Sequence, residues 1–402
     1  MHHVLVLEPF GKGSGGGSHR SLYEGWRDHS RHRFTVLELP AVHWKWRSRH
    51  SSLTLAREAC QLAADSIPFD AVFCSEILNL PEWKGFAGNV LGTLPSVAYF
   101  HENQFTYPLS PGEQRDYNFA YSNLLTWLSA DAAWFNSAYH LDDFYGAARD
   151  WLRRMPDYRH QDELEAAYAR SCVLPPGISP PISIESRSGS STPDLESSDL
   201  LESTTNSGAD RALVVGWVSR WEHDKRPDVF CRAVDALLQH DDQVELILLG
   251  QQFSRRPPEL ERLLQDHGNR IRHSGHAEDR QRYWELLSEI DLVVSTAVHE
   301  FFGIGILEAV SAGATPLLPC ELAYPEVFNL QNRNDRKPWF YHGELTAMEL
   351  ANAVERVRSG SRLQEQASSS EGNEDLRKYR WIHLAEAYDL ALEKVIANHP
   401  QR

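Results

Sequence analysis

Short apolar runs alternate with longer stretches of helical spacing along most of this chain. In the first half, the runs that predict β-strands are residues 4–7, 35–39, 71–74, 96–100, 132–135 and 172–174. In the second half they are residues 213–218, 244–248, 271–274, 292–294 and 315–318. Strands that are apolar on both faces are typical of parallel sheets covered by helices on each side. The pattern therefore predicts an α/β protein with two Rossmann-like lobes.

A polar segment separates the two series of strands. Residues 184–209 are rich in Ser, Thr and acidic residues, a composition that buries too little surface to offset the entropy of ordering. We predict an N-terminal lobe over residues 1–183, a flexible linker over 184–209 and a second lobe over 210–375. Helical spacing after residue 375 predicts a closing helix within 376–402, placed so that it can pack back on the first lobe.

The composition excludes several classes of protein. The formal net charge of −16 over 402 residues argues against broad, non-specific binding of nucleic acid. No apolar run approaches the roughly 20 residues that a membrane helix needs, and the first apolar run lacks the flanks of a signal peptide. We therefore expect a cytoplasmic protein without a membrane partner. The five cysteines are far apart, so they predict neither a disulfide framework nor a zinc site.

The segment from Glu300 to Glu308, E-F-F-G-I-G-I-L-E, carries the most specific chemistry. Carboxylates suit a ligand with many hydroxyl groups, because an ionised carboxylate accepts several hydrogen bonds at once. Gly303 and Gly305 leave room for backbone N–H groups to approach a ligand at the start of the helix that follows. The alternative is a pair of glutamates on a solvated helix face. The segment follows the apolar run at 292–294, and α/β sheets bind ligands at the carboxyl ends of strands, which favours the ligand site.

Two cations follow the first strand of the second lobe. Arg220 can hold phosphate oxygens with two parallel hydrogen bonds, and Lys225 supplies a mobile point charge nearby. Together they suit a diphosphate leaving group, whose negative charge grows as a glycosidic bond breaks. The alternative is that both side chains are simply solvated, and for Lys225 alone the two interpretations are nearly balanced.

These features together resemble the retaining glycosyltransferases of the GT4 type, which have the GT-B fold of two Rossmann-like lobes facing across a cleft and usually need no metal. The resemblance implies that Glu308 binds the ribose hydroxyls of a nucleotide and that Glu300 meets the hydroxyls of the donor sugar. Further donor contacts are implied for Arg220, Lys225, Gly303, Ile304, Gly305 and Ile306. The sequence has no Asp-x-Asp pattern, which usually holds a divalent ion in the other common glycosyltransferase architecture. We therefore expect no metal and no other cofactor.

Polar residues also follow a strand of the first lobe. The apolar run at 96–100 leads directly into His101-Glu-Asn-Gln104. A histidine at this point can donate a hydrogen bond to a sugar hydroxyl or a phosphate oxygen, and the corresponding histidine of GT4-like enzymes faces the donor sugar. The resemblance thus implies a catalytic role for His101 beside Glu300. The alternative is a structural histidine bonded to a neighbouring carbonyl group.

Two more segments of the first lobe suit an acceptor. Residues 11–19 form a glycine-rich loop before a helix, where backbone amides can meet a phosphate or an acceptor. Residues 43–50 are basic and aromatic in an otherwise acidic chain, a combination suited to unpaired RNA bases and their phosphates. Packing of Trp44 and Trp46 on the lobe, with the cations in solvent, is the alternative that the residues alone favour.

Three motifs in the first lobe indicate a more specific family within this class. The motifs Leu7-Glu-Pro-Phe10, Trp44-Lys-Trp-Arg47 and Phe100-His-Glu-Asn-Gln104 are similar to those of the tRNA-queuosine α-mannosyltransferases. The similarity covers most of the chain, with residues 184–209 and 359–375 as variable inserts. It implies GDP-mannose as donor and, as acceptor, the cyclopentene-diol of queuosine at the wobble position of tRNA for aspartate. The residues implied to bind the acceptor are Gly16, Gly17, His19, Trp44, Lys45, Trp46, Arg47, Glu102, Asn103 and Gln104.

Other functions stay open at this stage. One is a GT4-like transferase with a lipid or small-molecule acceptor, and another is a non-catalytic RNA-binding protein with the GT-B fold. An amphipathic basic helix, expected of a peripheral membrane enzyme, is not evident in the sequence. A phosphorylase with two similar lobes would need an anchored lysine for pyridoxal phosphate, and no feature marks one. A nucleotide-sugar donor and a queuosine-bearing tRNA are therefore the expected partners.

Overall fold

The structure is a computed structural model that describes residues 1–13, 17–65, 68–110, 112–181, 211–252, 256–332, 334–360 and 374–400. The predicted linker at 184–209 and most of the predicted insert at 359–375 lie outside the described residues. Within the described ranges, every helix is too short or too polar to traverse a bilayer.

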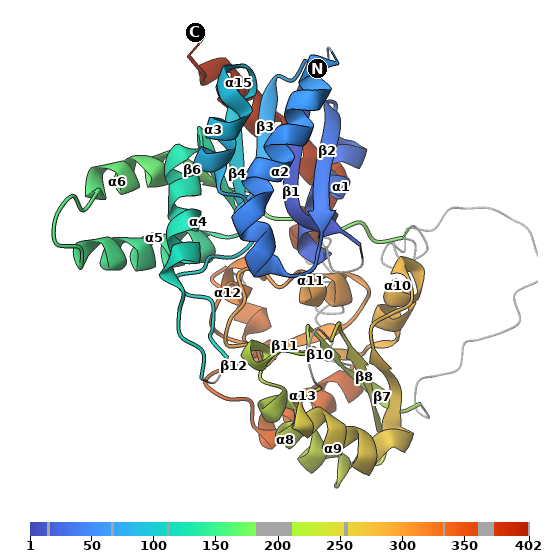
Figure 1. Cartoon of the computed structure of the whole chain (residues 1–402). Helices are drawn as coiled ribbons and strands as arrows, with labels where there is room; N and C mark the ends of the chain where they lie inside the picture. The colour runs from blue at the N-terminus through green and yellow to red at the C-terminus, as the bar shows by residue number, and fades with distance from the viewer. Residues whose placement is uncertain are drawn as a thin grey trace, which may run out of the picture. The chain divides into compact units, whose positions relative to one another are not determined.

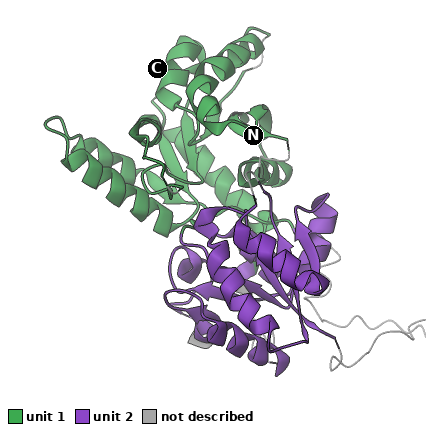
Figure 2. Ribbon diagram, turned by 60° about the horizontal axis from the view of Figure 1, so that its bottom comes forward, with its two compact units in different colours: residues 1–179, 299–302, 377–402 green, residues 180–298, 303–376 purple. Residues whose placement is uncertain are grey.

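The chain forms two compact units (Figure 2). Unit 1 comprises Met1–Ser179, His299–Phe302 and Arg377–Arg402, and unit 2 comprises Pro180–Val298 and Gly303–Leu376. The short segment His299–Phe302 differs from the predicted boundaries, which assign it to the second lobe. Within unit 1, Ser137 Oγ donates a hydrogen bond to the carbonyl oxygen of Phe301 at 2.6 Å, and the ring of Phe301 stacks on that of His140 at 3.8 Å.

Unit 1 contains a six-stranded parallel sheet in the order β2-β1-β3-β4-β5-β6. Its strands are β1 (His3–Lys12), β2 (Arg33–Pro40), β3 (Ala71–Ser75), β4 (Ser96–Phe100), β5 (Ala132–Phe135) and β6 (Ser171–Val173). Its longer helices are α1 (Gly17–His29), α2 (Trp44–Ala64), α3 (Leu80–Leu91), α4 (Tyr117–Ser129), α5 (Ala138–Arg153), α6 (Gln161–Ala169) and α15 (Trp381–Asn398). All six strands predicted from apolar runs are confirmed.

Alternate residues of strands β1 to β5 enter two different cores. In β4, Ala98 and Phe100 belong to a cluster that includes residues of α2 to α5. Val97 and Tyr99 belong to a second cluster, which includes residues of α1 and α15. Because side chains alternate across a strand, this division shows that helices cover both faces of the sheet.

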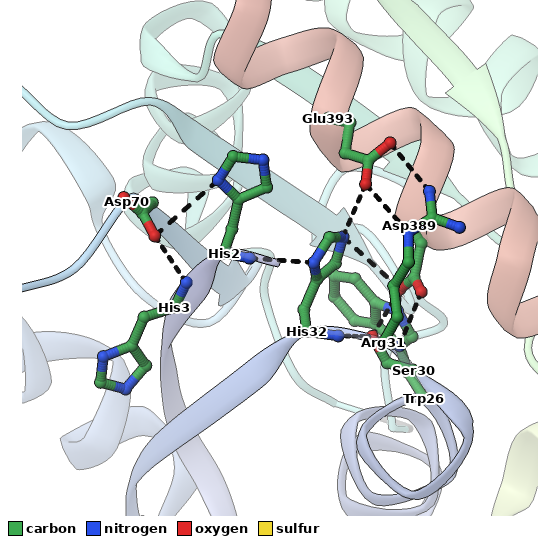
Figure 3. Close-up of polar contacts among 9 residues, drawn as sticks. All are labelled: His2, His3, Trp26, Ser30, Arg31, His32, Asp70, Asp389 and Glu393. Atoms are coloured by element: carbon green, nitrogen blue, oxygen red, sulfur yellow. Dashed lines mark hydrogen bonds and ion pairs between the residues drawn. The ribbon is translucent and has the colours of Figure 1, made fainter.

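Helix α15, from the far end of the chain, packs beside α1 (Figure 1). Its residues Trp381, Ala385, Tyr388 and Leu392 enter the second cluster at helical spacing. Figure 3 shows the polar part of this contact. The buried carboxylate of Asp389 accepts hydrogen bonds from Trp26 Nε1 at 2.8 Å, Ser30 Oγ at 2.6 Å and the backbone N–H of Arg31 at 3.0 Å. The helix predicted from the spacing of the last residues is thus an integral part of unit 1.

Unit 2 repeats the architecture, with a parallel sheet in the order β12-β11-β10-β7-β8-β9. Its strands are β7 (Leu213–Val218), β8 (Val244–Leu249), β9 (Ile271–Gly275), β10 (Leu292–Val294), β11 (Thr315–Pro319) and β12 (Phe340–Tyr341). Its main helices are α8 (Pro227–Leu238), α9 (Pro258–His267), α10 (Arg280–Glu289), α11 (Ile304–Ser311), α12 (Tyr324–Val327) and α13 (Ala347–Arg358). Five of these strands were predicted. β12 has only two residues, too few to give a hydrophobic pattern.

Each sheet has one point where the order of the strands reverses. In unit 1 the chain passes from β1 outward to β2 and then returns to β3 on the other side of β1. In unit 2 the corresponding reversal lies between β7 and β10. Open α/β sheets bind ligands outside the carboxyl ends of the strands at such a switch point. The fold therefore directs attention to the loops that follow β1 and β3 in unit 1, and β7 and β10 in unit 2.

Candidate functional site

In unit 2, α11 begins at a glycine that no other residue can replace without strain. Gly303 has φ of 84°, and a Cβ atom added there would lie 2.6 Å from Cε1 of Tyr324. The Tyr324 hydroxyl is held in turn by Ser295 Oγ at 2.7 Å. A Cβ at Gly305 would lie 3.2 Å from Cγ1 of Val218, at the end of β7. Close packing thus fixes the start of this helix beside the switch point.

The first turn of α11 provides backbone donors. The N–H groups of Ile304, Gly305 and Ile306 precede the first intrahelical hydrogen bond, which Leu307 N–H donates to the carbonyl oxygen of Gly303 at 3.0 Å. Such donors, together with the positive end of the helix dipole, favour an anion. The geometry is therefore suited to the phosphate or sugar oxygens of a nucleotide-sugar.

Glu308 lies on α11 and is 4% exposed, so its carboxylate is buried. One oxygen accepts a hydrogen bond from Arg280 at 2.5 Å, and the other accepts one from the Tyr283 hydroxyl at 2.7 Å. Burial, together with the Glu308 charge, raises the pKa of Tyr283 well above its usual value, so this hydroxyl keeps its proton and remains a donor. Both partners lie on α10 and orient the carboxylate.

The two predicted phosphate-binding cations differ in exposure. Arg220 is exposed and lies 3.6 Å from Glu222, measured between Nη2 and Oε2. Lys225 is 6% exposed, and its Nζ lies 3.1 Å from the Oδ2 of buried Asp224. The expectation that Lys225 is a mobile charge is therefore wrong, because packing and its ion pair hold the ammonium group in place.

Glu300 is placed by its neighbours in unit 1. Its Oε1 accepts a hydrogen bond from the backbone N–H of Phe302 at 3.4 Å, while the rings of His299 and Phe301 lie 4.5 Å apart. Glu300 therefore belongs to unit 1 and Glu308 to unit 2. The contacts of each glutamate are therefore given within its own unit.

In unit 1, the switch point gathers a buried group of carboxylates and imidazoles. Glu8, in β1, is 3% exposed, and its Oε1 accepts hydrogen bonds from Phe10 N–H at 2.9 Å and Ser75 Oγ at 3.1 Å. Its Oε2 lies 3.3 Å from Nδ1 of His19, in the first turns of α1. Burial opposes the imidazolium form, but the charges of Glu8 and Glu76 outweigh it and raise the pKa of His19 to about 9. His19 is thus positioned from one side by Glu8.

Glu76 follows β3 and lies on the other side of His19. Its Oε1 is 4.0 Å from His19 Nε2 and accepts the backbone N–H of Glu102 at 3.3 Å. Its Oε2 is buried and has no hydrogen-bond partner among the residues that the structure describes. Burial raises the pKa of Glu76 to about 8, although the charge of His19 opposes this shift. The Oε2 atom of this carboxyl group can therefore still form a hydrogen bond.

His101, directly after β4, completes the group. Its ring centroid lies 4.0 Å from that of His19 and 4.7 Å from that of Tyr99. Burial, with the charges of His19 and His140, lowers the pKa of His101 well below its usual value, so its ring is neutral at pH 7. Its backbone carbonyl accepts the side-chain amide of Asn136 at 2.9 Å. The structure therefore brings the predicted His19 and His101 together.

The three residues after His101 have distinct settings. Asn103 is fully buried, and its Oδ1 accepts the N–H groups of Phe105 and Thr106 at 3.0 and 3.1 Å. These bonds make Asn103 a residue that shapes the loop. Gln104 is partly buried, and its Nε2 donates to Oε1 of Glu102 at 3.0 Å. Glu102 and Gln104 thus form one polar pair next to the buried group.

The basic and aromatic stretch, residues 43–50, begins at the N-cap His43 and continues through the first two turns of α2. Trp44 packs on Phe119 with 4.9 Å between ring centroids, whereas Trp46 is 59% exposed and lies over His50 at 5.0 Å. Lys45 is exposed and 3.8 Å from Glu113, and Arg47 donates to the carbonyl oxygen of Pro40 at 3.0 Å. One tryptophan therefore packs on the unit, as the alternative interpretation expects, and the other presents its ring to solvent. Of the glycine-loop residues, Gly17 begins α1, and Gly16 lies outside the described residues.

Four residues of these sites were not predicted: Glu8, Glu76, Arg280 and Tyr283. The first two were detectable in principle, because each is an acidic residue at or just beyond the carboxyl end of an apolar run. Arg280 and Tyr283 lie on α10, where a charged or aromatic residue at a surface position is ordinary. They become meaningful only through the fold, which places both beside Glu308.

Comparison with solved structures shows the fold, and a family model adds the class. A sucrose-phosphate synthase from Thermosynechococcus elongatus matches with a TM-score of 0.67 at 14% identity, covering 99% of this chain and 100% of that chain. Anabaena Alr3699/HepE in complex with UDP and glucose matches with a TM-score of 0.61 at 17% identity, covering 98% and 99%. Residues 212–358 match the family described as glycosyl transferases group 1. The protein is thus a glycosyltransferase with the two-lobed GT-B fold, and the predicted fold class is confirmed.

The family follows from closer matches. Residues 3–178 match the family described as tRNA-queuosine alpha-mannosyltransferase N-terminal. A tRNA-queuosine alpha-mannosyltransferase from Drosophila melanogaster is 33% identical over 337 residues, which are 82% of this chain and 82% of that protein. The chain belongs to the tRNA-queuosine alpha-mannosyltransferase family, as the resemblance in its first lobe predicted.

Proposed function

We propose that this protein transfers mannose from GDP-mannose to the cyclopentene-diol of queuosine at the wobble position of tRNA for aspartate. The observation that carries the proposal is the union, on one chain, of a glycosyltransferase unit with an N-terminal unit of the queuosine mannosyltransferase family. The similarity to the Drosophila protein spans most of the chain and therefore includes both units. This supports the same acceptor for the two proteins. The proposed acceptor is also the basis for a cytoplasmic location.

Unit 2 is the proposed donor site. Glu308, held by Arg280 and Tyr283, accepts hydrogen bonds from the nucleotide ribose with its remaining lone pairs. The amides at the start of α11 receive oxygens of the diphosphate or the sugar. Arg220, which is exposed, and Lys225, which is fixed by packing, supply positive charge to the diphosphate. These charges replace a divalent ion on the leaving group, so donor binding needs no metal.

Transfer proceeds with retention at the sugar carbon. As the bond between mannose and the diphosphate breaks, negative charge grows on the departing oxygen, and the cations and helix amides stabilise it. The same departing oxygen accepts the proton of the acceptor hydroxyl, which attacks from the same face. His101 and Glu300 hold the donor sugar, and the neutral ring of His101 donates a hydrogen bond without adding charge.

Unit 1 is the proposed acceptor site. His19, Glu102 and Gln104 offer polar groups for the modified base, and Gly17 begins the helix that carries His19. Asn103 supports them by holding the turn. The exposed ring of Trp46 suits a base or a ribose, and Lys45 and Arg47 suit the RNA backbone.

The decisive experiment measures radiolabelled mannose transfer. The full-length protein is incubated with GDP-mannose and either queuosine-containing tRNA or the same tRNA without the modification. Transfer only to the modified tRNA supports the proposal, and equal transfer to both, or transfer from UDP-glucose instead, overturns it. A Glu308→Gln variant should lose about 10–100-fold in kcat/KM, because it replaces a charged hydrogen-bond acceptor. Glu285→Gln is the matched control, since Glu285 lies on α10 and pairs with Gln281 and Arg282.

A further inference from the structure

We propose that three buried side chains, Asn136, Ser137 and His140, are positioning residues for the transfer reaction. They lie between the end of β5 and the first turn of α5. Together they hold the backbone at His101 and the backbone beside Glu300 in one arrangement. The inference rests on the proposed function only for the roles that it gives to these two residues, and all the contacts lie within unit 1.

Asn136 fixes the backbone at His101. The two residues stand directly after paired residues of neighbouring strands, because Phe100 of β4 pairs with Phe135 of β5. Nδ2 of Asn136 donates a hydrogen bond to the carbonyl oxygen of His101 at 2.9 Å. Since a carbonyl oxygen only accepts, the nitrogen of the Asn136 amide must point to His101. The amide oxygen, Oδ1, then faces a different donor.

His140 supplies that donor. Its Nδ1 lies 2.9 Å from Oδ1 of Asn136, and Nδ1 carries the proton because the amide oxygen accepts. Burial, with the charge of His299, lowers the pKa of His140 well below its usual value, so the ring is neutral and this proton is its only one. A buried amide that is bonded at both ends keeps its orientation. His140 therefore acts on the backbone at His101 through Asn136.

The same segment holds the chain beside Glu300. Ser137 Oγ donates a hydrogen bond to the carbonyl oxygen of Phe301 at 2.6 Å and accepts the backbone N–H of His140 at 3.0 Å. The ring of His140 stacks on that of Phe301, with 3.8 Å between the centroids and 20° between the planes. Phe301 is 3% exposed and follows Glu300 directly in the chain. Residues 136–140 thus determine where the backbone beside both predicted catalytic residues lies.

These contacts exceed what the start of α5 needs. A serine at the N-cap already satisfies a backbone N–H of the first turn, and an apolar residue at position 140 would fill the core without a buried polar group. An imidazole and an amide are costly there unless both are hydrogen-bonded. Their bonds lead to the residue that the proposed reaction places against the donor sugar. Such precision matters for transfer, because misplacing a reacting group by about 1 Å can cost about 100-fold in rate.

The test compares catalysis with nucleotide binding. Asn136→Ala should lower kcat for mannose transfer about 10–100-fold, because the backbone at His101 is no longer fixed. The affinity for GDP should equal that of the wild type, since the proposed nucleotide contacts lie in unit 2. Ser96→Ala is the matched control, because it removes the hydrogen bond from buried Ser96 to Asp131 at 2.6 Å, at the opposite end of β4. It should lower the unfolding temperature to a similar extent and leave kcat unchanged.

Two substitutions of His140 separate its two contacts. His140→Phe keeps an aromatic ring against Phe301 and removes the donor to Asn136. His140→Asn keeps an N–H group close to the place of Nδ1 and removes the ring. Hydrogen exchange, which needs no substrate, should become faster around residue 101 in His140→Phe and around residue 301 in His140→Asn. Ser96→Ala should show wild-type exchange in both places.

A double substitution shows whether Asn136 acts through His101. His101→Ala alone should lower kcat, and adding Asn136→Ala should change it by less than about 2-fold, because the residue that Asn136 positions is already gone. Multiplication of the two effects, or a kcat of Asn136→Ala equal to that of Ser96→Ala, overturns the inference. If Asn136→Ala does not fold, His140→Phe replaces it in both comparisons.

The two proposals fail in different ways. Absence of mannose transfer by the wild type contradicts the proposed function, and hydrogen exchange then decides the inference without any substrate. Faster exchange around residues 101 and 301 in the His140 variants supports the positioning role. Exchange equal to that of the wild type in both places overturns it.

Discussion

The two units place a buried carboxylate near their switch points, but they treat it differently. In unit 2, each oxygen of Glu308 has a strong donor, Arg280 or the Tyr283 hydroxyl. In unit 1, Oε2 of Glu76 has no hydrogen-bond partner among the described residues, and the nearest cation, His19, lies 4.0 Å from its other oxygen. A buried carboxylate with two donors keeps its orientation before a ligand arrives, whereas one without them is destabilising until something binds.

The difference between Glu308 and Glu76 fits the proposed roles of the units, which are donor binding for unit 2 and acceptor binding for unit 1. A site for a nucleotide, which many transferases share, is built from a fixed backbone turn and a carboxylate that is already oriented. Unit 1, which matches the more specialised family, keeps polar groups whose needs the fold does not meet. The contrast concerns Glu308 and Glu76 alone, because Glu8 in unit 1 is held as firmly as Glu308, and the following experiments test how far each unit depends on such fixed contacts.

The largest effect is expected from Asp389→Ala. The change removes the acceptor of three buried or partly buried donors and should lower the free energy of unfolding by about 3–5 kcal/mol. Hydrogen exchange should show faster exchange in unit 1 than in unit 2. Glu393→Ala is the matched control one turn further along α15, because its ion pair with Arg31 is partly exposed and worth about 0–1 kcal/mol. Equal loss of protection in both units would show that they are not independent.

Gly303→Ala tests the fixed turn of unit 2. The added Cβ would lie 2.6 Å from Tyr324 Cε1, and residue 303 has a positive φ that alanine adopts only with strain. The free energy of unfolding should therefore fall by about 2–3 kcal/mol, and donor affinity should fall as well. Gly313→Ala is the control, since Gly313 also has positive φ, at 120°, but its Cβ would meet nothing within 4 Å. Thermal unfolding and GDP-mannose titration check both variants. If the two variants behave alike, backbone strain alone explains the loss and the contact with Tyr324 is unimportant.

A lower pH should reduce the free energy of unfolding of unit 1, because the buried His140 resists protonation. His140 is fully buried, and burial, with the charge of His299, lowers its pKa well below the usual value of 6.5. The unfolded chain therefore binds a proton below pH 6.5 that the folded chain does not, and stability falls as the pH decreases. One pH unit below 6.5 the loss is about 1.4 kcal/mol for this group. Denaturant unfolding at pH 7.5 and 5.5 measures it, and His140→Phe should show a smaller decrease than the wild type.

Tyr283→Phe should have the smallest effect. It removes one hydrogen bond to Glu308 and leaves Arg280 in place, so donor affinity should fall about 5-fold, or about 1 kcal/mol. Isothermal titration with GDP-mannose measures the change, and the unfolding temperature should stay nearly constant. A loss as large as that of Glu308→Gln would show that Tyr283 contacts the donor itself.

The sequence predicted the strands well because almost every one is an apolar run bounded by polar residues. It also predicted α11 and its glycines, since Gly303 and Gly305 stand at the end of the loop that follows the buried strand β10. It placed His19 and His101 in one lobe without showing that their rings meet. Glu8 and Glu76 were missed because a lone acidic residue gives no periodic pattern, and its meaning depends on two strands far apart in sequence becoming neighbours. The buried state of Lys225 was missed for the same reason, because burial of a cation depends on tertiary packing that composition does not reveal.

The contact between Trp26 and Asp389 joins residues 363 positions apart. During synthesis on the ribosome, the face of the first sheet that α15 covers stays open until residues 381–398 have been made. Unit 2 can fold while that face still waits for its helix, since its own strands emerge earlier. A nascent chain that stalls before α15 therefore carries an uncovered apolar surface, which makes it a natural client for chaperones and proteases.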